Sequence, residues 1–119
     1  MNHNQDFIAL CESALGSVRE VTWYDAVQWL QEESSTLLID VREDHEWEQG
    51  HIPGALHIGR GILERDIAKH YPDKSSRLLL YCGGGYRSAL AAESLQAMGY
   101  NNVYSLRGGF QAWKQSQCS

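Results

Sequence analysis

The stretch Leu78–Gly99, which reads LLLYCGGGYRSALAAESLQAMG, decides the fold that we expect for this chain. Its first four residues, 78–81, form a short apolar run that is typical of a buried β-strand. Three glycines follow, and residues 88–98 then repeat apolar side chains on one helical face. Gly99 is a good C-terminal stop for that helix. The stretch therefore predicts a buried strand, a glycine-rich loop and a helix in direct succession.

The segments on either side continue this alternation of strands and helices. Further strands are predicted over 37–41, 55–58 and 103–106, with a very short one ending at Val21. Helices are predicted from a capping box at Thr22 and Asp25 to about Leu30, and over 43–49, 62–70 and 110–115. This order predicts a mostly parallel sheet with helices on both faces, which binds ligands at the carboxyl ends of its strands. The residues after Ile39 and after Tyr81 are therefore where a site is expected.

The composition is that of an ordinary globular domain. The length of 119 residues fits a single domain, since domains typically hold roughly 100–150 residues. Apolar residues make up 43% and charged residues 21%, which excludes a disordered chain. The longest apolar run, 78–82, is far shorter than the ~20 residues of a membrane span. The net charge of −5 argues against nucleic acid or an anionic membrane as the main partner.

The cysteines and the first residues indicate a reducing compartment. Cys11, Cys82 and Cys118 are odd in number and far apart, so they predict neither a disulfide framework nor a CxxC metal pair. We expect Cys11 to be buried, while Cys118 could act as a resolving thiol for oxidised Cys82. The first six residues contain no Lys or Arg, and the apolar run after them ends at Glu12, so no signal peptide is expected. We therefore expect a cytoplasmic protein.

The loop Cys82–Ser88, CGGGYRS, is the strongest candidate site. Without Cβ atoms, the three glycines let successive backbone N–H groups turn inward and form a nest for an anion. The helix that begins near Ser88 adds its positive end at the same point. These donors favour the Cys82 thiolate, which is the nucleophilic form, and Arg87 can fix the loop or bind an anionic substrate. Sulfur transfer, phosphoryl transfer, arsenate reduction and a tight turn around a buried cysteine all remain open on these residues alone.

Four blocks of the sequence resemble the rhodanese family. Cys82–Ser88 is similar to its active-site loop, and the helix after it to the helix that follows that loop. The other blocks are Asp40–Glu43 with Glu46-Trp47, then Gly50–Ala55, and finally Leu106–Phe110 with Trp113. The resemblance covers roughly residues 20–115 and implies a single rhodanese domain. That domain would be an α/β fold of about five parallel strands flanked by helices on both faces, over residues 20–117, with residues 1–19 as an N-terminal helical extension.

The family resemblance also implies a chemistry. A rhodanese cysteine carries a sulfane sulfur as a persulfide, so we expect a sulfurtransferase or sulfur carrier that works through Cys82 and needs no cofactor. The expected donors are thiosulfate or a persulfide. The expected acceptors are cyanide or a thiol such as glutathione or a thioredoxin-like protein, with no nucleic acid or membrane partner. A regulatory binding module, or a phosphatase or arsenate reductase on the same fold, is the alternative, and the oligomeric state stays open.

Two features of the loop bear on the substrate. Cys82 and Arg87 bound a loop of six residues, whereas the related phosphatases and arsenate reductases have one residue more, so the resemblance favours sulfur over a tetrahedral phosphate. Efficient thiosulfate enzymes of the family often carry basic residues inside the loop, where this chain has Gly83 and Gly84. A persulfide is therefore at least as good a candidate for the donor as thiosulfate.

The sequence assigns a role to each candidate residue. Cys82 and Arg87 are the predicted catalytic residues. His45, His51 and His57 recur every six residues, which is not a helical metal-ligand spacing, so no metal site is expected. The predicted substrate- or anion-binding residues are Gly83, Gly84, Gly85, Tyr86, Ser88 and Arg60, and the predicted structural supports are Asp40, Arg42 and His51.

Overall fold

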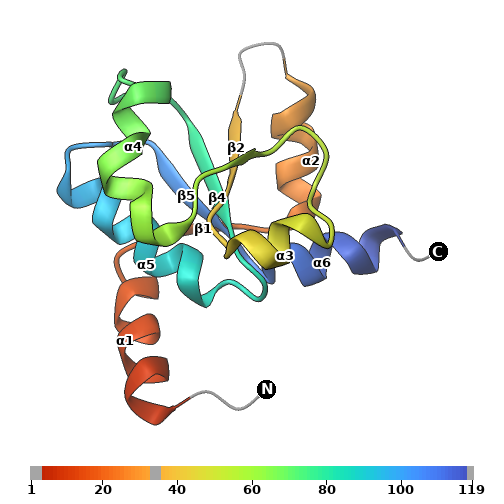
Figure 1. Cartoon of the computed structure of the whole chain (residues 1–119), viewed down its shortest axis with the longest axis horizontal. Coiled ribbons are helices and arrows are strands. Elements are labelled where there is room, and N and C mark those ends of the chain that lie inside the picture. Colours follow the sequence, from red (N-terminus) through yellow and green to blue (C-terminus); the bar gives the residue numbers. More distant parts are fainter. Residues whose placement is uncertain (1–3, 33–35, 118–119) are drawn as a thin grey trace.

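A sheet of five parallel strands runs through the centre of the computed structural model, which describes residues 4–32 and 36–117 (Figure 1). The strands are β1 (Arg19–Val21), β2 (Leu37–Asp40), β3 (Leu56–His57), β4 (Leu78–Tyr81) and β5 (Val103–Leu106). Their order in the sheet is β1-β5-β4-β2-β3, and every neighbouring pair is parallel. The predicted α/β fold with about five parallel strands is confirmed.

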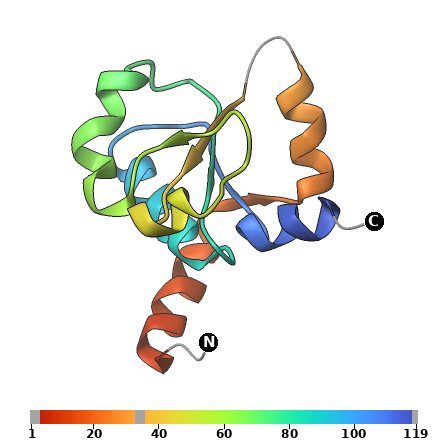
Figure 2. The same ribbon diagram turned by 45° about the vertical axis from the view of Figure 1, so that its right-hand side comes forward.

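Helices cover both faces of this sheet (Figures 1 and 2). They are α1 (Gln5–Leu15), α2 (Trp23–Gln31), α3 (Asp44–Glu48), α4 (Leu63–His70), α5 (Tyr86–Ala97) and α6 (Gly109–Gln117), with a short 3-10 turn, η1 (Arg60–Ile62), before α4. Apolar residues of α4 and α5 pack on one face, and those of α2 and α6 pack on the other. No helix in the described part of the chain is long and apolar enough to cross a membrane.

The position of β4 between two helical layers explains why its sequence is apolar throughout. Leu78 and Leu80 belong to the cluster under α4 and α5, whereas Leu79 and Tyr81 belong to the cluster under α2 and α6. All four side chains are fully buried. A strand covered on both faces has no solvent side, so apolar residues occupy every position instead of every second one.

The first helix, α1, lies outside these two layers and packs along α5 (Figure 1). At the centre of the contact, Cys11 and Ala14 of α1 meet Ala89 and Leu90 of α5. Cys11 is fully buried in this contact. Because α5 begins directly after the Cys82 loop, α1 supports the same end of the molecule as that loop.

The elements differ from the predicted ones mainly at their ends. Helix α5 begins at Tyr86, two residues before the predicted start at Ser88, because Gly85 adopts a left-handed conformation with φ of 107° that closes the loop. The irregular part of the loop is therefore only Cys82–Gly85. Helix α2 begins as predicted, with the Thr22 hydroxyl oxygen accepting a hydrogen bond from the Asp25 N–H at 3.2 Å.

Candidate active site

Cys82 follows β4 directly and lies at the carboxyl ends of the parallel strands. Its side chain is buried, with a relative exposure of 1% for the residue. The Cys82 Sγ accepts hydrogen bonds from the Gly85 N–H at 3.1 Å and from the Ser88 N–H at 3.4 Å. Two backbone donors of the glycine-rich loop and the helix after it are therefore aimed at this one sulfur.

A pair of buried hydroxyl groups completes the surroundings of this sulfur. The Ser88 Oγ lies 3.5 Å from the Cys82 Sγ and 2.8 Å from the Ser105 Oγ on β5. Both serines are fully buried. Ser88, which was predicted to bind substrate, therefore contacts the Cys82 sulfur. The contribution of Ser105 was not predicted, because β5 has a packing sequence and nothing in it points to Cys82.

Helix α6 holds the loop backbone from outside. The Cys82 carbonyl accepts a hydrogen bond from the Phe110 N–H at 2.7 Å, and the Gly83 carbonyl accepts one from the Gln111 N–H at 3.1 Å. In a trans peptide the C=O and N–H groups point in opposite directions, so the N–H groups of Gly83 and Gly84 point away from α6. Within the described residues these two N–H groups have no hydrogen-bond partner, which leaves them available to an anion.

The close approach of α6 depends on Gly109. This residue has a left-handed φ of 53°. A Cβ atom placed on it would overlap the Cys82 carbonyl oxygen and would also press on the Gly83 carbonyl oxygen. The segment Leu106–Phe110 therefore matters for the site because its glycines let the start of α6 reach the Cys82 loop.

The Arg87 side chain forms an ion pair with Glu46, a residue for which no role was predicted from the sequence. The Glu46 carboxylate on α3 accepts two hydrogen bonds from the Arg87 guanidinium, at 2.7 Å from Nη1 and 3.0 Å from Nη2. This bidentate pair lowers the pKa of Glu46 to about 2 and raises the pKa of Arg87. Glu46 also accepts the Glu43 N–H at 3.0 Å, which fixes it at the start of α3.

The buried pair of Asp40 and Arg42 ties several segments to the end of β2. The Arg42 guanidinium donates to the Asp40 carboxylate at 2.8 to 3.1 Å and to the Gly50 carbonyl at 2.7 Å. It also lies over the Phe110 ring, with Cζ 4.2 Å from the ring centre. No described contact of either side chain reaches Cys82, so the pair joins the 50s segment and α6 to the sheet, in keeping with the predicted supporting role.

The rings of His51 and His57 both stack on the Trp47 ring. The His51 and Trp47 rings are 3.5 Å apart and nearly parallel, and the His57 and Trp47 rings are 4.9 Å apart. His51 Nδ1 lies 3.2 Å from the Trp47 carbonyl, and His57 Nε2 lies 2.8 Å from the Arg42 carbonyl. These contacts shape the walls beside the loop. Among the described residues, no group of three His, Cys, Asp or Glu side chains could hold a metal ion.

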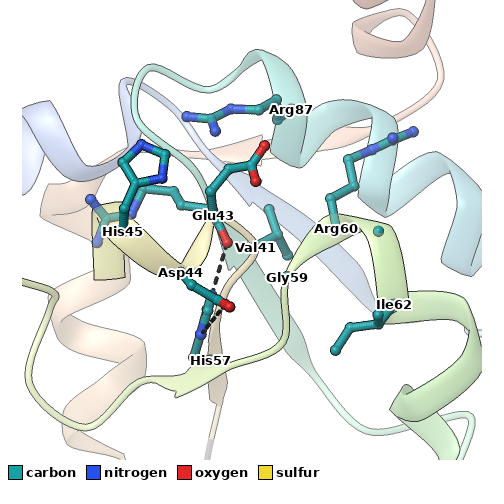
Figure 3. Close-up of a pocket in the computed structure, with 11 residues that line it drawn as sticks. Val41, Glu43, Asp44, His45, His57, Gly59, Arg60, Ile62 and Arg87 are labelled. Atoms are coloured by element: carbon teal, nitrogen blue, oxygen red, sulfur yellow. Dashed lines mark hydrogen bonds and ion pairs between the residues drawn. The ribbon is translucent and has the colours of Figure 1, made fainter. Parts of the chain in front are cut away.

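A cavity of about 540 Å³ lies beside the loop (Figure 3). Arg87 connects the cavity to the loop, and Arg60 of η1 lies on its rim as predicted. Tyr86, by contrast, packs against Phe7 of α1 with the rings edge to face and 6.4 Å apart, and Cys118 lies outside the described residues. The cavity is lined by Val41, Arg42, Glu43, Asp44, His45, His57, Gly59, Arg60, Gly61, Ile62 and Arg87.

Comparison with known proteins agrees with this geometry. The model of the rhodanese-like domain family matches residues 22–116. The chain belongs to this family. Its sequence is 38% identical over 78 residues to the thiosulfate sulfurtransferase GlpE of Coxiella burnetii, a match that covers 66% of this chain and 71% of that relative. The predicted resemblance to the rhodanese family is thus confirmed.

Two solved structures match the rhodanese-like fold over nearly the whole length of this chain. A Rhodopseudomonas palustris protein, described as of unknown function and a possible tyrosine phosphatase, superimposes with a TM-score of 0.82 at 30% identity and covers 98% of this chain and 95% of its own. The polysulfide-sulfur transferase homodimer of Wolinella succinogenes gives a TM-score of 0.78 at 28% identity, over 95% of this chain and 85% of its own.

Within the Cys82 loop, position 83 has little room for a side chain, whereas position 84 has ample room. A Cβ atom on Gly83 would lie 3.2 Å from Nη2 of Arg87, so a basic residue there would meet a cation. A Cβ atom on Gly84 would meet nothing within 4 Å, and Gly84 is exposed. Lack of space therefore does not explain why position 84 has no basic residue.

Proposed function

We propose that this protein is a sulfurtransferase that moves a sulfane sulfur through a persulfide on Cys82. The proposal is carried by one observation: backbone N–H groups of Gly85 and Ser88 point at the Cys82 sulfur, in a loop whose Gly83 and Gly84 N–H groups have no partner among the described residues. Such a site stabilises an anionic sulfur and then has further donors for a second one. Membership of the rhodanese-like family supports the same chemistry.

The first half-reaction loads the cysteine. The Cys82 thiolate attacks the sulfane sulfur of the donor, forming a new S–S bond while the S–S bond of the donor breaks. The electron pair of the broken bond leaves with sulfite when thiosulfate is the donor, or with a thiolate when a persulfide is the donor. The persulfide on Cys82 is then an anion, which the Gly83 and Gly84 N–H groups can receive.

The second half-reaction empties the cysteine. An acceptor thiolate, such as that of glutathione or a thioredoxin-like protein, or cyanide attacks the outer sulfur, and Cys82 leaves as a thiolate. With a thiol acceptor, the S–S bond that forms replaces the one that breaks. With cyanide, a C–S bond forms in its place and thiocyanate is released. Neither reaction consumes an external oxidant or reductant. Arg87 is held by Glu46 through Nη1 and Nη2, and its guanidinium also interacts with the Cys82 side chain, which fits the catalytic role predicted for it.

Phosphate chemistry on the same fold is the competing function. The Rhodopseudomonas palustris protein that covers most of this chain is described as a possible tyrosine phosphatase, which makes the comparison necessary. A phosphatase loop needs cationic donors free for the phosphoryl oxygens. Here the Arg87 guanidinium already binds the Glu46 carboxylate through Nη1 and Nη2. This arrangement favours sulfur over phosphate.

Intact-mass spectrometry tests the proposal. Incubation with thiosulfate or glutathione persulfide should add the mass of one sulfur atom, and dithiothreitol should remove it. Cys82→Ser should abolish the addition, whereas the matched variant Cys11→Ser, which changes a fully buried thiol outside the loop, should retain it. Loading that survives in Cys82→Ser would overturn the proposal. Hydrolysis of an aryl phosphate without any sulfur loading would instead establish the phosphatase, and neither activity would indicate a binding module.

A further inference from the structure

Arg60 stands apart from the other cations of the molecule. Every other Arg and Lys in the described residues has a carboxylate, a backbone carbonyl or an aromatic ring as a partner. Arg60 has none of these for its side chain, and its Nε is buried without a hydrogen bond. A buried donor without an acceptor is costly, so the position calls for a ligand that supplies one.

The main chain fixes Arg60 at the rim of the cavity beside the Cys82 loop. Its N–H donates to the Val41 carbonyl at 3.0 Å, which attaches η1 to the segment that leaves β2. The cavity of about 540 Å³ lies within the ~300–1,000 Å³ typical of small-molecule sites. Thiosulfate would fill only a small part of this space, which has room for a larger thiol such as a short peptide.

The charged groups that line the cavity place acids on one wall and the cation of Arg60 on another. Arg42 forms an ion pair with Asp40, and Arg87 forms one with Glu46. Both cations are therefore already paired and are not the first choice for a ligand carboxylate. On the wall formed by the start of α3, Glu43 has no basic partner within the described part of the chain. Asp44 is 91% exposed at its side chain and lies 3.8 Å from Nδ1 of His57. Figure 3 shows the Glu43 carboxylate between the side chains of Arg87 and Arg60, while Asp44 turns to His57.

We propose that this cavity selects a zwitterionic thiol, whose carboxylate binds Arg60 and whose ammonium group faces Glu43 and Asp44. Cysteine persulfide and short cysteine peptides such as glutathione persulfide have this chemistry. A dianion such as thiosulfate gains Arg60 but meets two carboxylates, which disfavour it. The inference rests on the proposed function, since it names the donor of the same sulfur transfer: the outer sulfur passes to Cys82 and the thiol departs as its thiolate.

The test compares three organic persulfides that differ in their charged groups, with thiosulfate as the inorganic reference donor. Cysteine persulfide has both a carboxylate and an ammonium group, 3-mercaptopropionate persulfide has the carboxylate, cysteamine persulfide has the ammonium group, and thiosulfate is a dianion. The rate of sulfur addition to Cys82 is followed by quenched-flow mass spectrometry for each donor. The wild-type protein should load fastest from cysteine persulfide.

Two variants should separate the two charged contacts. Arg60→Gln should slow loading from the two carboxylated persulfides by roughly tenfold or more, the effect of one charge-assisted hydrogen bond, and leave cysteamine persulfide unchanged. Glu43→Gln should slow the two donors with an ammonium group and speed up thiosulfate. Asp44→Asn serves as a second acid variant, since Glu43 also begins α3. The matched controls are Arg65→Gln and Glu48→Gln, which change like charges outside the cavity.

The outcomes distinguish this inference from the proposed function. If Arg60→Gln slows all four donors equally or slows none, the inference is wrong while the sulfurtransferase stands. The inference is equally wrong if thiosulfate is the fastest donor of the wild-type protein. If no donor adds sulfur to Cys82, the proposed function fails, and the inference fails with it.

Discussion

At the scale of single residues, the pair of Glu46 and Arg87 has the clearest measurable consequence. The pKa of Glu46 is lowered from its ordinary value of 4.5 to about 2 by its hydrogen bonds from Arg87. A carboxyl group whose pKa is lowered by folding stabilises the fold above its unfolded pKa, and that stabilisation disappears as the pH falls towards the folded value. The contribution of Glu46 should therefore be complete above pH 4.5 and vanish between pH 4.5 and about 2.

Urea unfolding as a function of pH checks this prediction. Glu46→Gln should lower the free energy of unfolding at pH 7 by about 1–2 kcal/mol, allowing for the partial exposure of the pair. The difference from the wild-type protein should shrink as the pH falls below 4.5. Glu48→Gln, on the same helix but exposed, should show no such trend. A difference that is constant from pH 7 to pH 2.5 would show that the charge of Glu46 is not responsible.

Gly84 gives a second prediction at this scale. Position 84 is exposed and open, with ordinary backbone geometry, so a lysine can be placed there without strain. Gly84→Lys should raise the rate of loading from thiosulfate several-fold, because it adds a cation beside the Cys82 loop. Ala97→Lys adds the same charge at the other end of α5 and should change nothing. An unchanged thiosulfate rate in Gly84→Lys would mean that loop charge does not limit this donor.

Sequence reasoning found the local part of the site and missed the distant part. The contacts inside 82–88 follow from three consecutive glycines, because each group that acts on the sulfur is within a few residues of it. Glu46 and Ser105 lie 41 and 17 residues from their partners, Arg87 and Ser88. Such pairs depend on which strands are neighbours, and the pattern along the chain does not contain that order.

At the scale of elements, the contact between α6 and the Cys82 loop fixes the direction of the loop backbone. Gly109→Ala should force the Cys82 carbonyl away from the Phe110 N–H and lower the rate of sulfur loading by an order of magnitude or more, since two loop N–H groups would lose their direction. The measurement is the same loading rate, with the free energy of unfolding beside it.

Gly108→Ala is the matched control for this element. Gly108 is also left-handed, with φ of 74°, but its Cβ atom would meet Ala112 within α6 and not the loop. Both variants should lose stability through backbone strain. Only Gly109→Ala should lose activity beyond what its stability explains. Equal losses of activity in the two variants would show that α6 acts on the fold alone.

The start of α5 is the element boundary that the sequence predicted least well. A helix beginning at Ser88 was predicted, because the apolar pattern starts after it, yet Tyr86 and Arg87 already belong to the helix. The reason is the closing turn at Gly85, which is a property of backbone conformation rather than of side-chain pattern. The consequence for the site is that Arg87 projects from a helix, where Glu46 can fix its direction.

At the scale of the whole molecule, the two apolar clusters on either face of β4 hold the layers together. Leu79 is fully buried at the centre of the sheet, under α2 and α6. Leu79→Ala should lower the free energy of unfolding by about 2–5 kcal/mol, the usual cost of a cavity at such a position. Leu10→Ala, at a site that is 56% exposed, should change it by less than about 0.5 kcal/mol. Chemical denaturation of both variants gives the comparison.

The overall architecture was the most predictable level. Short apolar runs that alternate with helical patterns are sufficient to indicate a parallel sheet covered on both faces. The order β1-β5-β4-β2-β3 was not predicted from the pattern, because strands such as Val103–Leu106 and Leu37–Asp40 are similarly apolar and could exchange places. That order nevertheless decides which side chains meet at the edge where Cys82 lies.

The pairing of β1 with β5 has a consequence for how the molecule is made. The N-terminal strand completes its parallel pairing only with the last strand of the chain, and α6 reaches the Cys82 loop only after that. Pairings between distant parts of a chain form late and slowly. During synthesis, Cys82 therefore leaves the ribosome before the helix that holds its loop, and a partly made chain carries the thiol in a loop without that support. The Cys82 loop therefore acquires all of its hydrogen bonds only after the last helix has reached it.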